Sequence, residues 1–231
     1  MPQYAVVRYV GRIAKIVQTT LGPGARPVKH DLQIALNLAV HTPDPQDVLD
    51  LNLIATTASG GKAAFETLYS RYERRVYNYV RTFVRQPSVS EEVVIDTMMA
   101  VWNGAKGFNR SSRVSTWILG IARHKALDAV RKVGRSGAEV TLDDASELPD
   151  EATGPADAVD QVFRSKLVRR AVAELSIDHQ EILRLAFFEE LPYEEIASLL
   201  SIPDNTVKTR VFYAKQQLRR LLEGRELETA E

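Results

Sequence analysis

The spacing of apolar and polar positions predicts a mostly helical protein. Between residues 62 and 133, apolar side chains recur at three- and four-residue steps in three successive segments. This spacing places them on one side of an amphipathic helix. The first segment carries one continuous apolar stripe, made up of Phe65, Leu68, Tyr69, Tyr72, Val76, Tyr79, Val80 and Phe83.

Local signals set the limits of these three helices. The first is expected to end at Gln86-Pro87, because the residue before a proline avoids helical geometry. Ser88 or Ser90 is expected to cap the second, with Glu91 and Glu92 in its first turn. The third begins near Ser115. Trp102 and Trp117, in the second and third helices, are expected in the core, and the remaining apolar positions are Val94, Ile95, Met98, Val101, Ile118, Ile121, Ala122, Leu127 and Val130.

Residues 191–211 have the spacing of a helix-turn-helix. The first helix would bury an apolar face that includes the small Ala197, above which a second helix can cross closely. Ser201-Ile202-Pro203 interrupts the pattern, and Ser201 stands where glycine is common, so a positive φ there would strain the turn. The next helix would bury Val207, Val211 and Ala214. Its outer side would carry Lys208, Thr209, Arg210, Phe212, Tyr213 and Lys215.

Basic, hydroxyl and aromatic side chains on one helix face suit the DNA major groove. Lys208, Arg210 and Lys215 could neutralise phosphates, although a charged helix face is more often simply solvated. Two short helices with a tight turn also occur in folds that never bind DNA. The pattern alone therefore leaves both interpretations open.

Composition narrows the class of protein. The 231 residues include no Cys and only four scattered His, so we expect no metal site and no cofactor. No apolar run approaches the roughly 20 residues that span a bilayer, and no signal-peptide core is present. No glycine-rich phosphate loop, nucleophile elbow or metal-ligand spacing indicates an enzyme. We therefore expect a cytoplasmic, non-enzymatic protein without stable membrane insertion.

The zero net charge conceals an uneven distribution. Residues 64–133 hold twelve Lys and Arg against six Asp and Glu, whereas residues 134–160 hold one Arg against eight acids. The acidic stretch also contains Gly and Pro and few large apolar residues, which is typical of a flexible linker. The chain is thus predicted to consist of a basic helical module, an acidic linker and a second helical module.

At this point the arrangement resembles a family. Residues 62–133 are similar to the promoter minus-ten domain of bacterial RNA polymerase sigma factors of the extracytoplasmic-function (ECF) type, and residues 164–222 to the minus-thirty-five domain. The matching stretches are 64–69, 90–97, Val101-Trp102, Phe108-Asn109, 115–128, 175–183 and 206–210. The resemblance implies an all-α fold of two small domains, a sigma region 2-like bundle and a sigma region 4-like helix-turn-helix, joined by the flexible acidic linker.

The resemblance also implies roles for particular residues. The docking surface for core RNA polymerase would comprise Glu92, Asp96 and Thr97. The promoter minus-ten element, including an unstacked base held near Phe108, would be bound by Phe108, Asn109, Arg110, Arg113, Arg123, His124, Lys125 and Arg131; Lys132 would lie on the same basic face. The minus-thirty-five element would be read by Lys208, Thr209, Arg210, Phe212 and Tyr213.

Several of these roles stay open on the residues alone. The acidic side chains of the docking surface could simply be an exposed acidic face, and the basic ones near the minus-ten element a solvated helix face. Phe108 is either part of the base pocket or a core plug. Lys208 or Arg210 could address guanine, and Phe212 could contact a thymine methyl. Tyr213 stands where many members have Arg, so the promoter sequence does not follow from the resemblance.

The expected domain limits are as follows. An N-terminal extension (1–49), either a regulatory or docking segment or a disordered tail, precedes the region 2-like domain (50–133). The linker (134–160), the region 4-like domain (161–224) and a C-terminal tail (225–231) follow. The expected partners are core RNA polymerase, promoter DNA and an anti-sigma factor. A stand-alone helix-turn-helix regulator is the alternative function, although no parallel-sheet pattern of a receiver domain precedes residue 160.

Overall fold

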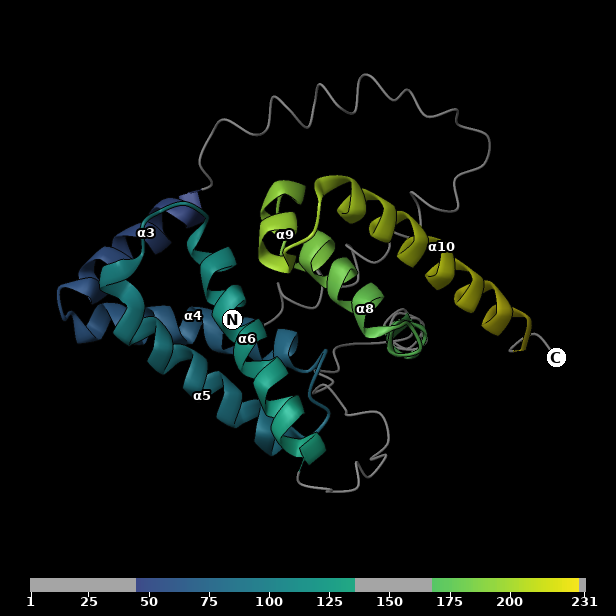
Figure 1. Cartoon of the computed structure of the whole chain (residues 1–231), viewed down its shortest axis with the longest axis horizontal. Helices are drawn as coiled ribbons and strands as arrows, with labels where there is room; N and C mark the ends of the chain where they lie inside the picture. The colour runs from purple at the N-terminus through teal and green to yellow at the C-terminus, as the bar shows by residue number, and fades with distance from the viewer. Residues whose placement is uncertain (1–44, 136–167, 229–231) are drawn as a thin grey trace, which may run out of the picture. The chain divides into compact units, whose positions relative to one another are not determined.

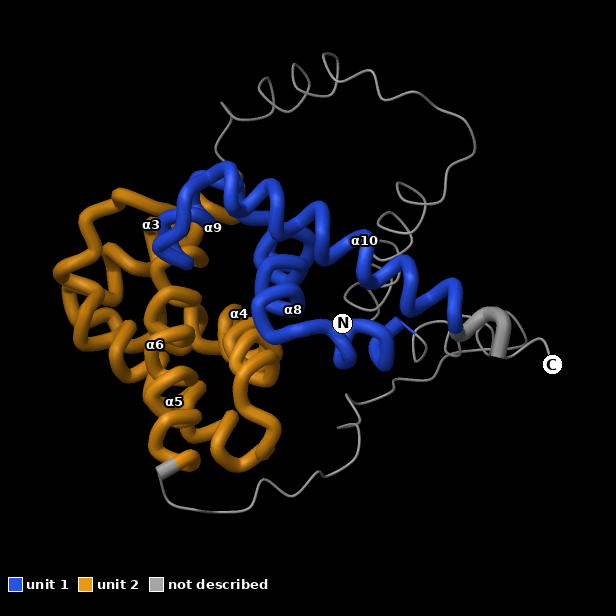
Figure 2. The backbone as a smooth tube through the Cα atoms, turned by 45° about the vertical axis from the view of Figure 1, so that its right-hand side comes forward, with its two compact units in different colours: residues 1–22, 139–231 blue, residues 23–138 orange. Residues whose placement is uncertain are grey.

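The computed structural model describes residues 45–135 and 168–228, and every regular element in these two ranges is a helix. The ranges belong to two compact units (Figure 2). We call residues 45–135 the N-terminal unit and residues 168–228 the C-terminal unit. Within the described residues, no helix is both long enough and apolar enough to cross a membrane. Most of the predicted linker and of the N-terminal extension falls outside the described residues.

The N-terminal unit is a bundle of four α-helices (Figure 1). They are α3 (Pro45–Ala58), α4 (Lys62–Val80), α5 (Pro87–Gly104) and α6 (Val114–Arg135), with the short 3₁₀ turn η2 (Ala105–Gly107) after α5. Helices α4, α5 and α6 pack against one another, and α3 packs on α4, α6 and η2. The predicted stripe on α4 forms much of the core, with Leu68, Tyr72, Val76, Tyr79 and Val80 buried.

Two predicted helix limits in this unit were wrong. Helix α4 ends at Val80. The N–H groups of Thr82 and Phe83 then bond to the carbonyls three residues back, as in a tighter helical turn. This turn extends the apolar spacing of α4 as far as Phe83. Helix α5 begins at Pro87, which needs no N–H partner at a first helical position. Neither serine caps it. The Ser90 side chain is buried and its hydroxyl donates to the backbone carbonyl of Gln86.

This earlier start also moves Glu91 and Glu92 out of the first turn of α5, contrary to expectation. The other predicted start is close, since α6 begins at Val114, one position before Ser115. Both tryptophans are half-buried: Trp102 packs edge-on to Phe65, with ring centroids 5.0 Å apart.

The C-terminal unit contains a helix-turn-helix preceded by shorter helical pieces. Residues 168–173 are helical and lead to α8 (Ile177–Leu183), which continues as the π-helical turn η3 (Arg184–Phe188). Helices α9 (Tyr193–Leu200) and α10 (Asp204–Glu228) form the predicted motif, and α10 packs on both α8 and α9. Helix α10 extends past residue 224, where the predicted domain ends. Val207, Val211 and Ala214 are buried, as predicted.

The turn between α9 and α10 depends on a strained serine. Ser201 has φ 55°, the left-handed conformation that favours glycine, as the sequence suggested. The N–H groups of Ser201 and Ile202 bond to the carbonyls of Ser198 and Ala197, which ends α9 cleanly. The turn sets where α10 begins and therefore which of its side chains face outward.

Candidate promoter and polymerase interfaces

The exposed side of α10 carries the predicted minus-thirty-five residues. Lys208 and Thr209 are exposed, and the rings of Phe212 and Tyr213 are 61% and 53% exposed. These two rings meet edge to face, with centroids 5.4 Å apart. The Thr209 hydroxyl donates to the backbone carbonyl of Asn205, so its free lone pairs can still accept a hydrogen bond. Two exposed aromatic rings in contact form an apolar patch, and contiguous apolar patches are a feature of interaction surfaces.

Arg210 and Lys215 are less available than their neighbours on α10. A guanidinium nitrogen of Arg210 lies 3.2 Å from a carboxylate oxygen of Asp178 on α8, and the arginine side chain is only about one-third exposed. The Lys215 ammonium lies over the ring of Phe187, 5.2 Å from its centroid. Burial lowers the pKa of Lys215. The sequence placed both cations on the outer side without these partners.

In the N-terminal unit, residues 108–113, which we call the capture loop, join η2 to α6 in a defined shape. The Phe108 ring packs on Trp117, with centroids 5.0 Å apart, yet it remains half-buried. The Asn109 side-chain oxygen accepts a hydrogen bond from the N–H of Ser111 at 3.0 Å. Arg110 has φ 59°, a conformation that non-glycine residues adopt at some cost. Phe108 is thus neither fully inserted in the core nor fully free.

The predicted cations of α6 are spread along its exposed and half-buried positions. His124 is exposed, and its Nδ1 lies 2.8 Å from the Gly120 carbonyl, so Nδ1 must carry the hydrogen because a carbonyl only accepts. Arg131 is also exposed and pairs with Asp128 at 3.0 Å. Arg123 is half-buried, and Lys132 is exposed. None of these arrangements closes a specific pocket by itself.

The predicted polymerase surface on α5 needs one correction. Glu92 and Asp96 are exposed, but Thr97 is completely buried and its hydroxyl donates to the Val93 carbonyl at 2.7 Å. A buried side chain cannot offer contacts to a partner, so Thr97 stabilises the helix core instead. The resemblance to the family assigned Thr97 to the surface together with Asp96, although adjacent helical residues face different directions.

Two apolar side chains share that surface and were missed. Ile95 is 54% exposed and Met99 is 51% exposed, at the helical spacing that joins them to Glu92 and Asp96. We call these four residues the docking face. Ile95 was expected among the apolar core positions, but the buried face of α5 runs through Val94 and Met98 and leaves Ile95 outside it. Lys125 on α6 borders this face, with its ammonium 3.9 Å from an Asp96 carboxylate oxygen.

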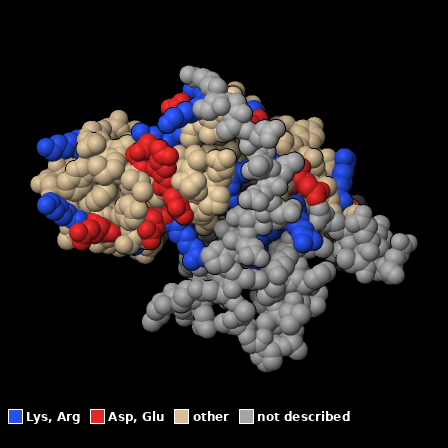
Figure 3. Space-filling model, turned by 90° about the horizontal axis from the view of Figure 1, so that it is seen from below, with Lys and Arg blue, Asp and Glu red and all other residues tan. Residues whose placement is uncertain are grey.

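Charged side chains of both signs are visible on one face of the structure (Figure 3). On the face drawn in Figure 3, clusters of acidic and of basic side chains lie next to one another, and neither kind covers that face continuously. No group of His, Cys, Asp and Glu side chains in the described ranges is placed to hold a metal ion.

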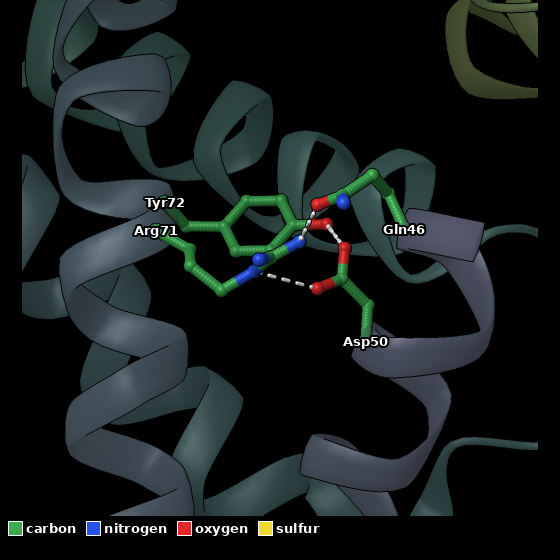
Figure 4. Close-up of polar contacts among 4 residues, drawn as sticks. All are labelled: Gln46, Asp50, Arg71 and Tyr72. Atoms are coloured by element: carbon green, nitrogen blue, oxygen red, sulfur yellow. Dashed lines mark hydrogen bonds and ion pairs between the residues drawn. The ribbon is translucent and has the colours of Figure 1, made fainter. Parts of the chain in front are cut away.

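A polar cluster between α3 and α4 was not predicted from the sequence. The Asp50 carboxylate is only 3% exposed and accepts hydrogen bonds from the Tyr72 hydroxyl and from Arg71 Nε, the latter at 2.9 Å (Figure 4). Another Arg71 nitrogen donates to the Gln46 side chain at 2.7 Å. Burial and the bond to Asp50 raise the pKa of Tyr72. The i, i+4 spacing of Gln46 and Asp50 was the only sequence signal for this cluster.

Comparison with known proteins bears on both units. Residues 68–136 match the family Sigma-70 region 2, and residues 165–218 match Sigma-70, region 4. The ECF RNA polymerase sigma factor RpoE of Cereibacter sphaeroides is 30% identical over 159 residues, which cover 68% of this chain and 86% of that protein. The chain belongs to the ECF family of RNA polymerase sigma factors.

Further relatives agree with this assignment. The ECF RNA polymerase sigma factor SigK of Mycobacterium sp. (strain KMS) is 29% identical over 178 residues, covering 77% of this chain and 92% of SigK. Among solved structures, RpoE of Bartonella quintana, crystallised with the anti-sigma factor NepR, has a TM-score of 0.57 at 23% identity. The match covers 69% of this chain and 96% of the Bartonella quintana protein.

CnrH in complex with the cytosolic domain of CnrY has a TM-score of 0.55 at 22% identity and covers 76% of this chain and 98% of that one. These two structures show a shared fold. As an ECF sigma factor, the protein directs promoter-dependent initiation of transcription by RNA polymerase.

Proposed function

We propose that this ECF sigma factor divides promoter recognition between its two units. The C-terminal unit reads the minus-thirty-five element through Lys208, Thr209, Phe212 and Tyr213, with Arg210 available when it leaves Asp178. The exposed aromatic pair on α10 supports this assignment most directly, because the two rings stand beside Lys208 and Thr209 on the side away from the core. Side chains of these types contact base edges, phosphates and thymine methyls.

The N-terminal unit acts at the minus-ten element and in strand opening. The capture loop holds an unstacked base of the non-template strand against Phe108, with Asn109 and Arg110 at its edge. Arg123, His124, Lys125 and Arg131 on α6 meet the neighbouring phosphates and bases. The half-buried Phe108 supports this role, because a ring held on one side by Trp117 can still offer area for stacking.

The docking face on α5 binds core RNA polymerase through Glu92 and Asp96, with Ile95 and Met99 supplying apolar area. An anti-sigma factor, of the kind crystallised with RpoE of Bartonella quintana, binds this sigma factor and competes for the same surfaces. The protein works in the cytoplasm, where polymerase and promoters are, and catalyses no reaction itself. In a competition pull-down, a candidate anti-sigma factor should displace core polymerase from the sigma factor. If the sigma factor binds the candidate and core polymerase at the same time, the two do not compete for the same surfaces.

Run-off transcription tests the central proposal. Purified protein and core polymerase are supplied with a pool of templates that carry randomised promoter sequence, and the transcribed templates are sequenced. We expect enrichment of two spaced motifs, one near position minus ten and one near minus thirty-five. A stand-alone regulator would yield no transcript without another sigma factor.

The docking face is tested by charge reversal at Asp96. Asp96→Arg should weaken association with core polymerase about tenfold, because a reversed charge opposes a complementary partner. Glu73→Arg, an equal change at an exposed position of α4, is the matched control. Circular dichroism verifies that both variants fold. If both variants associate equally well with core polymerase, Asp96 is not part of the interface.

A further inference from the structure

We propose that Asp47, in the first turn of α3, is a positioning residue for strand opening, because it holds Arg113 and so fixes the far end of the capture loop. Arg113 Nε lies 3.4 Å from a carboxylate oxygen of Asp47. This inference rests on the proposed function of the capture loop. It changes the role of Arg113 from a direct DNA contact to an internal anchor.

The first turn of α3 is a firm support for this contact. Gln46 and Asp50, on either side of Asp47, are both bonded to Arg71 on α4, and Asp50 also accepts the Tyr72 hydroxyl (Figure 4). Asp50 is almost fully buried, so its bonds are shielded from water. The Asp47 side chain itself is 23% exposed. Its backbone therefore sits in a turn that is tied to the bundle on both sides.

Helix α3 reaches both ends of the capture loop. At the start of the loop, α3 packs against η2. At its end, Asp47 holds Arg113, whose backbone carbonyl accepts the N–H of Trp117 in the first turn of α6. The Trp117 ring in turn supports Phe108. Arg113 thus links α3 to the residue that backs the proposed stacking ring.

A loop that is already shaped loses less conformational freedom when a base binds to it. Arg110 has a left-handed backbone conformation that would relax if the loop ends could move. Holding Arg113 keeps the ends in place. The expected consequence of losing Asp47 is slower strand capture, with promoter finding unchanged.

The test uses full-length protein in holoenzyme with core polymerase and a promoter from the run-off selection. Asp47→Asn removes the charge with little change in shape. We expect permanganate reactivity of thymines near the start site to fall about five- to tenfold, within the range of a partly screened charged contact. Transcription from a pre-melted template should stay at the wild-type level. Glu223→Gln, which breaks the exposed Arg219–Glu223 pair of α10, is the control expected to change neither.

Two further variants separate anchoring from DNA contact. The Arg113→Asp variant should open the promoter poorly. The double variant, in which Asp47→Arg and Arg113→Asp exchange the two charges, should recover at least half of wild-type promoter opening. If Arg113 contacts DNA instead, the exchange will fail like Arg113→Asp and Asp47→Asn will open normally, which would overturn the proposal. Wild-type protein that opens no promoter would contradict the proposed function itself. Thermal unfolding of every variant shows whether a defect comes from the fold.

Discussion

The two regions that we propose to read the promoter obtain their shapes in different ways. On α10, Lys208, Thr209, Phe212 and Tyr213 face outward because the helix buries Val207, Val211 and Ala214 on the other side. In the capture loop, three side chains are each placed by a separate contact: Phe108 by Trp117, Asn109 by the Ser111 N–H, and Arg113 by Asp47. One region is shaped by helix periodicity and the other by tertiary contacts.

This difference suits the two tasks. Duplex DNA presents a regular groove, and a regular helix can be matched to it with few adjustable parts. A base extruded from the stack has no such regular frame, so its pocket must be assembled from irregular backbone and several elements. We therefore expect substitutions in the capture loop to affect strand opening and substitutions on α10 to affect promoter binding.

The largest expected effect is in the capture loop. Replacing Asn109 and Arg110 together by Ala should reduce strand opening tenfold or more. The turn loses the Asn109 bond that shapes the pocket beside Phe108, and the base stack that this pocket supports is worth roughly 1–3 kcal/mol. Filter binding to duplex promoter should remain nearly intact, and a pre-melted template should restore transcription. Equal failure on duplex and pre-melted templates would show that the loop does not capture a strand.

The second effect separates α10 from the loop. Lys208→Ala should weaken binding of the holoenzyme to its promoter by about 1–3 kcal/mol if the ammonium reads a base, and by less if it meets only phosphate. Footprinting should show lost protection at the minus-thirty-five region. Permanganate reactivity per bound complex should be unchanged. A fall in that ratio would mean that the two regions do not divide the work as proposed.

The sequence predicted α10 better than the loop for a physical reason. Helical spacing alone placed Val207, Val211 and Ala214 in the core, and the position of Ser201, where glycine is common, marked it as a residue whose φ could be positive. The contact between Asp47 and Arg113 joins residues far apart in the chain, so no local pattern encodes it. The positive φ of Arg110 had no signal either, because arginine shows no preference for that conformation.

The errors on α5 have a local cause. The helix begins at a proline ahead of both serines, and its buried face includes Thr97 and leaves Ile95 outside. Serine caps and acidic first turns are frequent signals of a helix start. Here they lay inside a helix that had already begun. The composition of the docking face was therefore predicted only in part.

A smaller effect is expected from Asp178, which ties α10 to α8. Asp178→Asn should release Arg210 and remove a negative charge near the DNA, so holoenzyme binding should tighten about threefold with a steeper dependence on salt. Discrimination between matched and mutated minus-thirty-five duplexes should fall, because a freed arginine contacts phosphates at many positions. Fluorescence anisotropy with both duplexes measures this, with Glu194→Gln on α9 as control. Unchanged binding to both duplexes would mean that Arg210 stays away from DNA.

The smallest effect concerns the turn that aims α10. Ser201→Gly should stabilise the C-terminal unit by about 0.5–1 kcal/mol, because the left-handed conformation costs a non-glycine residue roughly 1–2 kcal/mol, while glycine loses more backbone entropy on folding. Since φ 55° is already adopted, the direction of α10 should not change, and promoter preference should stay the same. Denaturant unfolding measures the stability, and run-off selection measures the preference. A changed minus-thirty-five motif would show that the strained serine, and not helix periodicity alone, sets how α10 meets DNA, and the contrast between the two regions would weaken.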